Sequence, residues 1–204
     1  MIDDILKLNG LSVDTLERLS FPSKLGKSLK QNLHYFEKDA LFSELTNMTE
    51  WLSEQTNLDE IALDFRIKSI DSITLKYERY YPNRQVRQVF NDILGFRAFC
   101  DTYDELINLD GDFFRTVDMS KGKANDDGYR GLHLYYQKDN FHYPIEIQFN
   151  TLYDRQINNW LHSYLYKKNY PLEIGREMRN RYEHGMIRSR EEFEEVLRNV
   201  LCGN

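Results

Sequence analysis

Two apolar segments late in the chain most restrict how it can fold. Residues 129–137 and 143–149 have strand length and strand composition, and the polar residues 138–140 between them are typical of a turn. Shorter strand patterns cover residues 61–67, 95–100 and 114–119. Helical patterns separate and flank these strands, so the sequence predicts an α/β or α+β fold in which helices flank a mixed sheet.

Helical spacing dominates the beginning of the chain. Apolar residues at helical intervals predict several helices, one of which has Pro22 in its first turn. That helix would carry Lys24, Lys27 and Lys30 on one face, because they are spaced by three residues. Such a face is either simply solvated or a stripe that follows phosphate groups.

These patterns divide the 204 residues into three parts, which we expect to pack as one domain. They are a helical N-terminal extension (1–57), a core (58–170) and a helical, strongly charged C-terminal tail (171–204). A chain of this length can bury a core without disulfides. Cys100 and Cys202 are too few for a disulfide framework, so we expect both to be reduced thiols.

The charge balance excludes a globally basic nucleic-acid-binding protein, since 27 basic residues face 33 acidic ones and the net charge is −6. Local basic patches remain compatible with that balance. The acidic first residues do not resemble a signal peptide, and no segment approaches 18 apolar residues. The sequence therefore predicts a cytoplasmic protein with no membrane contact.

Three cations and a hydroxyl converge at the junction of a predicted strand and a predicted helix. Arg66 and Lys68 would leave the strand on the same face, and Ser72 and Lys76 lie one turn apart on the helix that follows. The amino end of a helix also favours anions. The group is either a cradle for a triphosphate or a charged surface corner, and it is not a P-loop.

Two carboxylates interrupt apolar segments. Asp92 lies in Phe-Asn-Asp-Ile-Leu and Glu146 in Pro-Ile-Glu-Ile-Gln-Phe. Acids within nearly buried strands are costly unless they are paired or bound to metal, and two on adjacent strands could hold Mg²⁺ against nucleotide phosphates. Alternatively, both face solvent at a sheet edge. Arg97, five residues after Asp92, could stack its guanidinium plane on a base.

The segment Gly-Tyr-Arg-Gly-Leu-His at 128–133 follows a polar loop. Tyr129 is either a stacking platform for a base or an aromatic residue at a strand edge. His133 is more often a structural histidine than a catalyst in such a position. The five histidines show no zinc-binding spacing.

Taken in order, these motifs resemble the RelA/SpoT synthetase domain over residues 60–170. The matching fragments are Arg66-Ile-Lys-Ser, Ser72-Ile with Lys76, Asp92-Ile-Leu-Gly-Phe-Arg97, Gly128-Tyr-Arg-Gly-Leu-His133, Glu146-Ile-Gln148, Trp160-x-His162 and Tyr166-Lys167. The chain resembles the single-domain small alarmone synthetases and their toxin relatives.

The resemblance implies a nucleotidyltransferase-like sheet and an ATP-dependent pyrophosphokinase, in which a 3′-hydroxyl attacks the β-phosphorus of ATP and AMP leaves. Each site residue takes its role from the family pattern. Arg66 and Arg97 would sandwich adenine; Lys68, Ser72 and Lys76 would hold the phosphates; Asp92 and Glu146 would bind Mg²⁺; Tyr129 would stack on the acceptor base; and His133 and Gln148 would complete the acceptor side. Glu146 would also help to activate the hydroxyl.

Departures from the family pattern lie on the acceptor side. The family often has Arg and Thr where this chain has Asn150 and Thr151, and many members have Glu where it has Leu161. Acidic Asp126 and Asp127 precede Gly128, where many synthetases have Asn or Ser. These changes disfavour an anionic guanosine nucleotide as acceptor.

We therefore favour the toxin branch, which transfers pyrophosphate to the 3′ CCA end of uncharged tRNA and inhibits translation. Lys24, Lys27 and Lys30 would then contact acceptor-stem phosphates, and a small antitoxin protein would be a partner. The alternative is an alarmone synthetase that uses GDP or GTP. A second alternative is a nucleotide-binding relative that has lost turnover.

Overall fold

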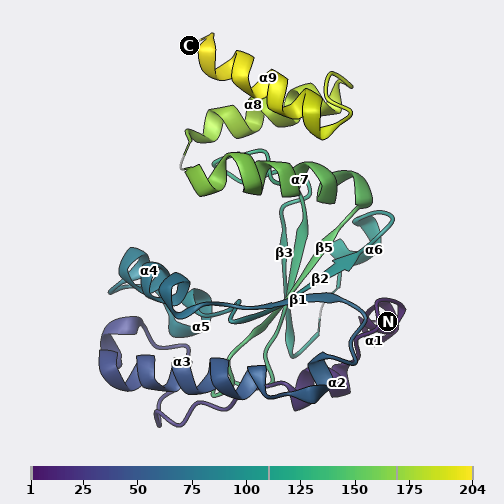
Figure 1. The fold of residues 1–204 in the computed structure, drawn as a ribbon. Coiled ribbons are helices and arrows are strands. Elements are labelled where there is room, and N and C mark those ends of the chain that lie inside the picture. Colours follow the sequence, from purple (N-terminus) through teal and green to yellow (C-terminus); the bar gives the residue numbers. More distant parts are fainter. Residues whose placement is uncertain (1, 110, 169, 204) are drawn as a thin grey trace. The chain divides into compact units, whose positions relative to one another are not determined.

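The computed structural model describes residues 2–109, 111–168 and 170–203, and the chain divides into two compact units. Unit 1 comprises Met1–Ala98, Asn108–Thr116 and His133–Gln148, and unit 2 comprises Phe99–Ile107, Val117–Leu132 and Phe149–Asn204. The two units are described separately below. Figure 1 shows their helices and strands, coloured along the chain.

The sheet has five strands in the order β1-β2-β5-β4-β3. Their bounds are Asp64–Ile67 (β1), Leu94–Phe99 (β2), Phe114–Asp118 (β3), Leu132–Tyr136 (β4) and Ile145–Asn150 (β5). This mixed sheet with flanking helices confirms the fold class predicted from the sequence. The five strand segments predicted at 61–67, 95–100, 114–119, 129–137 and 143–149 each overlap one of the observed strands, although β2 begins one residue early, β5 ends one residue late and residues 129–131 lie before β4.

The strands of unit 1 have one polar and one apolar face. Along β2, Leu94, Phe96 and Ala98 are buried, whereas Gly95 and Arg97 are half-buried. Antiparallel pairing sets Arg66 of β1 opposite Gly95 and Asp64 opposite Arg97, so these side chains share the polar face. The apolar face therefore builds the core, and the polar face is left for chemistry.

The helices of unit 1 are α1 (Ile2–Leu8), α2 (Val13–Arg18), α3 (Lys38–Ser53), α4 (Ile70–Tyr80) and α5 (Val86–Val89). Two 3₁₀ turns cover Leu33–Tyr35 and Thr56–Leu58. Helix α3 buries Leu41, Leu45, Met48 and Leu52, as its spacing predicts. Ser69 caps α4 by accepting a hydrogen bond from the Ser72 amide, so the helix that the sequence predicts for Ser72 and Lys76 begins here.

The predicted helix after Pro22 is wrong. Residues 20–31 form no helix, so Lys24, Lys27 and Lys30 do not share a helical face, although all three are exposed. The backbone pairs elsewhere instead: the Ser23 amide donates to Phe141 O at 2.6 Å and the Leu29 amide to Asn140 O at 2.8 Å. Gly26 has φ +67°, which also ends helical geometry.

The predicted strand around Asp92 is also wrong. Asp92 lies in a turn just before β2, and the one-turn helix α5 precedes it. Val86, Val89 and Phe90 are buried, so the apolar run reflects packing of α5 and the turn rather than a strand. The Lys68 amide donates to Ile93 O at 2.8 Å and fixes this turn beside the end of β1.

Unit 2 holds α6 (Asp104–Ile107), α7 (Leu152–Tyr164), a 3₁₀ turn (Tyr166–Lys168), α8 (Leu172–Glu183) and α9 (Arg190–Cys202). The predicted helical tail is thereby confirmed. The helices α7, α8 and α9 surround an apolar cluster that includes Ile157, Leu161, Met178 and Phe193. Among the described residues, no helix is long and apolar enough to cross a membrane. Cys100 and Cys202 are free thiols, as predicted.

Candidate functional site

The centre of the candidate site is an ion-pair cluster around Asp92. Lys68 directly follows β1, Lys76 lies in the second turn of α4, and Asp92 precedes β2. Lys68 Nζ lies 2.5 Å from Asp92 Oδ2 and Lys76 Nζ lies 2.9 Å from Asp92 Oδ1. The sheet register and the α4 cap thus bring two ammonium groups onto one carboxylate.

Arginine side chains flank this cluster on the polar face of the sheet. Arg66 and Arg97 line a cavity of about 60 Å³ together with Lys68, Asp92, Glu146 and Gln148. The pairing of β1 with β2 explains why the two arginines are close. Arg66 of β1 is opposite Gly95 of β2, and Arg97 lies two residues after Gly95 on β2. Six of the residues predicted for the site therefore line one cavity.

Glu146 is buried on β5 and held by three side chains. His133 Nδ1 lies 2.9 Å from Glu146 Oε1, the Tyr135 hydroxyl donates to the same oxygen at 2.9 Å, and Gln148 Nε2 donates to Oε2 at 2.6 Å. Burial raises the pKa of Glu146, but these hydrogen bonds and the charge of His133 outweigh it and lower the pKa to about 2. The carboxylate is therefore ionised at any physiological pH.

The carboxylates Asp92 and Glu146 are the candidate ligands for a metal ion. No cluster of three or more histidine, cysteine or acidic side chains that could hold an ion occurs among the described residues. Mg²⁺, however, is usually held by one or two protein carboxylates, with substrate phosphates and water completing its shell. Asp92 and Glu146 line one cavity and so fit that requirement. They do not supply the four ligands of a structural zinc site.

Ser72 stays at the first turn of α4 rather than at the cavity. The hydroxyl of Ser69 donates to Ser72 Oγ at 3.0 Å, and Ser72 does not line the cavity that contains Arg66 and Asp92. Lys76 reaches the site through Asp92 and also contacts Asn91 Oδ1 at 3.2 Å.

Tyr129 belongs to the loop of unit 2 that precedes β4. The ring of Tyr129 has Lys123 Nζ at 4.9 Å from its centroid, and its amide donates to Asp127 Oδ1 at 3.1 Å. Asp127 in turn pairs with Lys123 at 2.7 Å, and Asp126 with Arg130 at 2.7 Å. The hydrogen bond from Arg130 lowers the pKa of Asp126. The two acids of this loop are thus neutralised by cations of the same loop.

The other two departures from the family pattern have local structural roles. Asn150 Nδ2 donates to Arg130 O at 2.9 Å, and Asn158 Nδ2 donates to the same oxygen at 2.6 Å. Leu161 is fully buried in the apolar cluster of unit 2. Neither position adds a charge or a free polar group that would select one acceptor over another.

A family model described as a region found in RelA/SpoT proteins matches residues 65–170, slightly more than half of the chain. The chain belongs to the RelA/SpoT family. Membership supports pyrophosphokinase chemistry of the synthetase type. No curated protein matches the chain.

The chain is similar to several solved structures. Small alarmone synthetase 1 from Bacillus subtilis, bound to its product pppGpp, is 20% identical with a TM-score of 0.44, covering 79% of this chain and 89% of that one. Small alarmone synthetase 2 from Bacillus subtilis is 22% identical (TM-score 0.42; 78% and 89% covered). A GTP pyrophosphokinase family protein from Streptococcus pneumoniae is 22% identical (TM-score 0.41; 79% and 90% covered). Likeness at this level assigns no substrate.

Most residues predicted for the site lie within the RelA/SpoT region. The exceptions are Lys24, Lys27 and Lys30, which precede it. Sequence reasoning missed Tyr135, although its position two residues after His133 on one strand would have placed it on the same face. It also missed Arg179, which is 1% exposed and donates to Asp154 Oδ1 and Gly128 O. Arg179 lies in a charged helix, and nothing in such a pattern distinguishes a buried arginine from a solvated one.

Proposed function

We propose that this RelA/SpoT protein is an ATP-dependent pyrophosphokinase that transfers the β,γ-pyrophosphate of ATP to the 3′-hydroxyl at the CCA end of uncharged tRNA. The observation that carries the proposal is one cavity on the polar face of the sheet, lined by two carboxylates and three cations. Phosphoryl-type transfer requires positioning and charge neutralisation more than covalent catalysis, and this set of side chains supplies both.

On the donor side, Arg66 and Arg97 offer guanidinium planes that can stack on adenine. Lys68 and Lys76 would exchange their contacts with Asp92 for contacts with the phosphates. Ser72 lies outside the cavity, so it would contribute only if the phosphates extend to the amino end of α4. We therefore assign Arg66, Lys68, Ser72, Lys76 and Arg97 to the binding of ATP.

Asp92 and Glu146 would hold Mg²⁺, which when bound neutralises developing charge on the ATP oxygens. Because the pKa of Glu146 is about 2, its carboxylate is ionised and can accept a hydrogen bond, but it is a weak base. It orients the 3′-hydroxyl as the O–P bond to the β-phosphorus forms. The bond between the β-phosphorus and the α,β-bridging oxygen breaks, that oxygen leaves with AMP, and the proton of the 3′-hydroxyl is released to solvent.

On the acceptor side, Tyr129 would stack on the terminal base, and His133 and Gln148 would position the acceptor beside Glu146. Support for RNA as the acceptor comes from three exposed lysines within seven residues, Lys24, Lys27 and Lys30. Their irregular backbone can still follow phosphates, because electrostatic contacts do not require a helical face. As a toxin with this activity, the protein would have a small antitoxin protein as its partner.

A specific observation favours GDP or GTP as the second candidate acceptor. The loop acids Asp126 and Asp127 are paired with Arg130 and Lys123, so they would not repel a guanosine phosphate as the sequence suggested. Synthesis of an alarmone would use the same donor site.

The deciding experiment offers γ-labelled ATP with Mg²⁺ and one of three acceptors: deacylated tRNA, GDP or GTP. Label on tRNA alone supports the proposal, and label on GDP or GTP alone replaces it with the alarmone function. Tyr129→Phe should lower acceptor use more than ATP binding. ATP binding without any transfer would indicate an inactive relative.

Lysine variants test the RNA contact. Lys24→Glu combined with Lys27→Glu should weaken tRNA use and reduce its salt dependence, because each phosphate contact contributes about one unit to the slope of log K against log salt. Arg188→Glu combined with Arg198→Glu changes exposed residues of unit 2 by the same charge and is the control. Equal losses in both double variants would argue against a lysine contact with RNA.

A further inference from the structure

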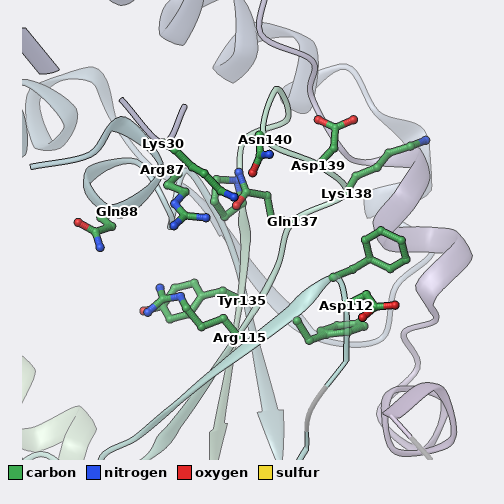
Figure 2. Close-up of a pocket in the computed structure, with 13 residues that line it drawn as sticks. Lys30, Arg87, Gln88, Asp112, Arg115, Tyr135, Gln137, Lys138, Asp139 and Asn140 are labelled. Carbon is green, nitrogen blue, oxygen red and sulfur yellow. The ribbon is translucent and has the colours of Figure 1, made fainter. Parts of the chain in front are cut away.

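The loop that carries Tyr129 lies outside the cavities of unit 1. A cavity of about 470 Å³ in that unit brings Arg87 and Arg115 together with Tyr135 (Figure 2). Every residue that lines it belongs to unit 1, whereas Tyr129 lies in the loop 126–131 of unit 2. Within unit 2 this loop has a set of contacts of its own, which extends into the helices α7 and α8.

Two side chains from other elements hold the backbone just before Tyr129. The Tyr166 hydroxyl donates to Asp127 O at 2.9 Å, and Arg179 Nε of α8 donates to Gly128 O at 2.8 Å. Burial raises the pKa of Tyr166, so its hydroxyl remains a donor throughout the physiological range. Because these carbonyls lie outside the sheet, side chains take the place of the backbone hydrogen bonds that a strand would supply.

Asn158 of α7 holds the backbone just after Tyr129. Asn158 Nδ2 donates to Arg130 O at 2.6 Å, and its Oδ1 accepts from the Arg130 amide at 3.3 Å. One buried side chain therefore binds both backbone groups of the same loop residue. Tyr129 thus lies between two anchored stretches of backbone.

The anchor Arg179 is itself fixed by a buried network. Arg179 Nη1 donates to Asp154 Oδ1 at 2.7 Å. The other carboxylate oxygen, Asp154 Oδ2, accepts from the Tyr103 hydroxyl at 2.7 Å and from Thr151 Oγ1 at 3.0 Å. Both Arg179 and Asp154 are buried, and a fully satisfied buried network of this kind is rigid. The position of Gly128 O is therefore set by α7 and α8.

The backbone of the loop also determines the pose of the Tyr129 ring, because the ring lies against Gly131. A Cβ at position 131 would lie 2.7 Å from the Tyr129 hydroxyl oxygen and 3.1 Å from its Cε1. Lys123 Nζ lies 4.9 Å from the centroid of the same ring. A shift of the backbone on either side of Tyr129 would move the ring relative to both neighbours.

We propose that Tyr166, Asn158 and Arg179 are positioning residues for the acceptor, because they hold the loop in which Tyr129 presents its ring to the acceptor base. This inference rests on the proposed function, in which Tyr129 stacks on that base. If the loop adopts the binding pose in only a fraction of the molecules, the apparent affinity for the acceptor falls by that fraction. Loss of an anchor should therefore raise the KM for the acceptor. The KM for ATP should not change, since the residues assigned to ATP belong to unit 1.

The test measures transfer of label from γ-labelled ATP with Mg²⁺ to whichever of deacylated tRNA, GDP and GTP the wild type uses. Tyr166→Phe removes one hydroxyl donor, and Asn158→Asp replaces the donor that faces Arg130 O with a carboxylate oxygen. We expect each variant to raise the KM for the acceptor about tenfold and to leave the KM for ATP unchanged. Tyr182→Phe is the matched control, because it removes a hydroxyl of unit 2 that donates to Tyr153 O, outside the loop.

Tyr129→Ala separates failure of this proposal from failure of the proposed function. If Tyr129→Ala raises the KM for the acceptor and both anchor variants leave it unchanged, the positioning role is rejected and the proposed function stands. If Tyr129→Ala has no effect, or the wild type transfers label to no acceptor, the proposed function is wrong and the positioning role fails with it. Equal rises in both KM values, or the same rise in Tyr182→Phe, would reject a positioning role in favour of a purely structural one. Should Asn158→Asp melt early, Tyr166→Phe keeps the aromatic ring and decides the test.

Discussion

The Tyr135 hydroxyl donates to Glu146 Oε1 at 2.9 Å, and the two residues lie on β4 and β5, which are neighbours in the sheet. Glu146 can be both buried and ionised because donors surround it, Tyr135 among them. The same contact raises the pKa of Tyr135, although burial is its larger cause, so this hydroxyl remains a donor throughout the physiological range. The strand pair therefore fixes the protonation state of the candidate site.

Glu146 should make stability depend on acidity in a defined window. Its pKa is about 2 in the folded protein and 4.5 in the unfolded chain, so its contribution is complete above pH 4.5 and is lost as pH falls through 2. The loss should reach roughly 3 kcal/mol, since one pKa unit corresponds to about 1.4 kcal/mol. Urea unfolding from pH 2 to 7 should show the free-energy difference between wild type and Glu146→Gln shrinking below pH 4.5. A difference that is constant with pH would contradict the role of these donors, and Glu60→Gln, at an exposed position, controls for removal of a carboxylate.

Asp92→Asn should separate catalysis from phosphate binding. The change removes the charge that Lys68 and Lys76 both contact, so we expect turnover to fall at least a hundredfold. ATP binding in EDTA should be unchanged or tighter, because both ammonium groups are then available for phosphates. Calorimetry with and without Mg²⁺ measures the two effects, with the exposed Asp14→Asn as control. Weaker ATP binding in EDTA would instead make Asp92 a purely structural anchor for the lysines.

Arg179→Met should destabilise the protein strongly. Arg179 is 1% exposed and donates to Asp154 Oδ1 at 2.7 Å and to Gly128 O at 2.8 Å. Its loss therefore removes a hydrogen-bond donor from a carboxylate and from a carbonyl. Removing one member of a buried pair typically costs about 3–5 kcal/mol. Arg181→Met lies two residues away on α8 and breaks a half-exposed pair with Glu177, for which we expect about 0–1 kcal/mol. Chemical denaturation of both variants tests this, and similar losses would mean that Asp154 finds another partner.

Much of the fold follows from local patterns. The β1 and β2 strands and the start of α4 at Ser69 were predictable because alternation and capping are properties of neighbouring residues. The convergence of Lys68, Lys76 and the Asp92 carboxylate was only partly predictable. Helix spacing places Lys76 on the same face of α4 as Ser72. The turn that holds Asp92, however, depends on a hydrogen bond from the Lys68 amide to Ile93 O, which no local pattern encodes.

The failures have a common physical cause in contacts between distant residues. Lys24, Lys27 and Lys30 have helical spacing, but Ser23 and Leu29 pair with residues more than a hundred positions away. Arg87 and Arg115 were likewise missed as a pair, because α5 and β3 bring them to one cavity only in the folded chain. The sequence shows that these residues are present, but it does not show that the folded chain brings them close together.

Gly128→Ala should show how closely the loop before β4 packs on α8. Gly128 has φ +87°, and a Cβ there would lie 2.3 Å from Gly175 O, a backbone atom that cannot rotate away. Strain of about 1–2 kcal/mol from the left-handed backbone would add to an overpacking cost of about 1–3 kcal/mol. Gly185→Ala has φ +71° with no atom within 4 Å, so it should cost the strain alone. Urea unfolding measures the free energy of unfolding of both variants, and the difference between their losses is the cost of the clash with Gly175 O. Equal losses would mean that α8 moves away from the loop at little cost.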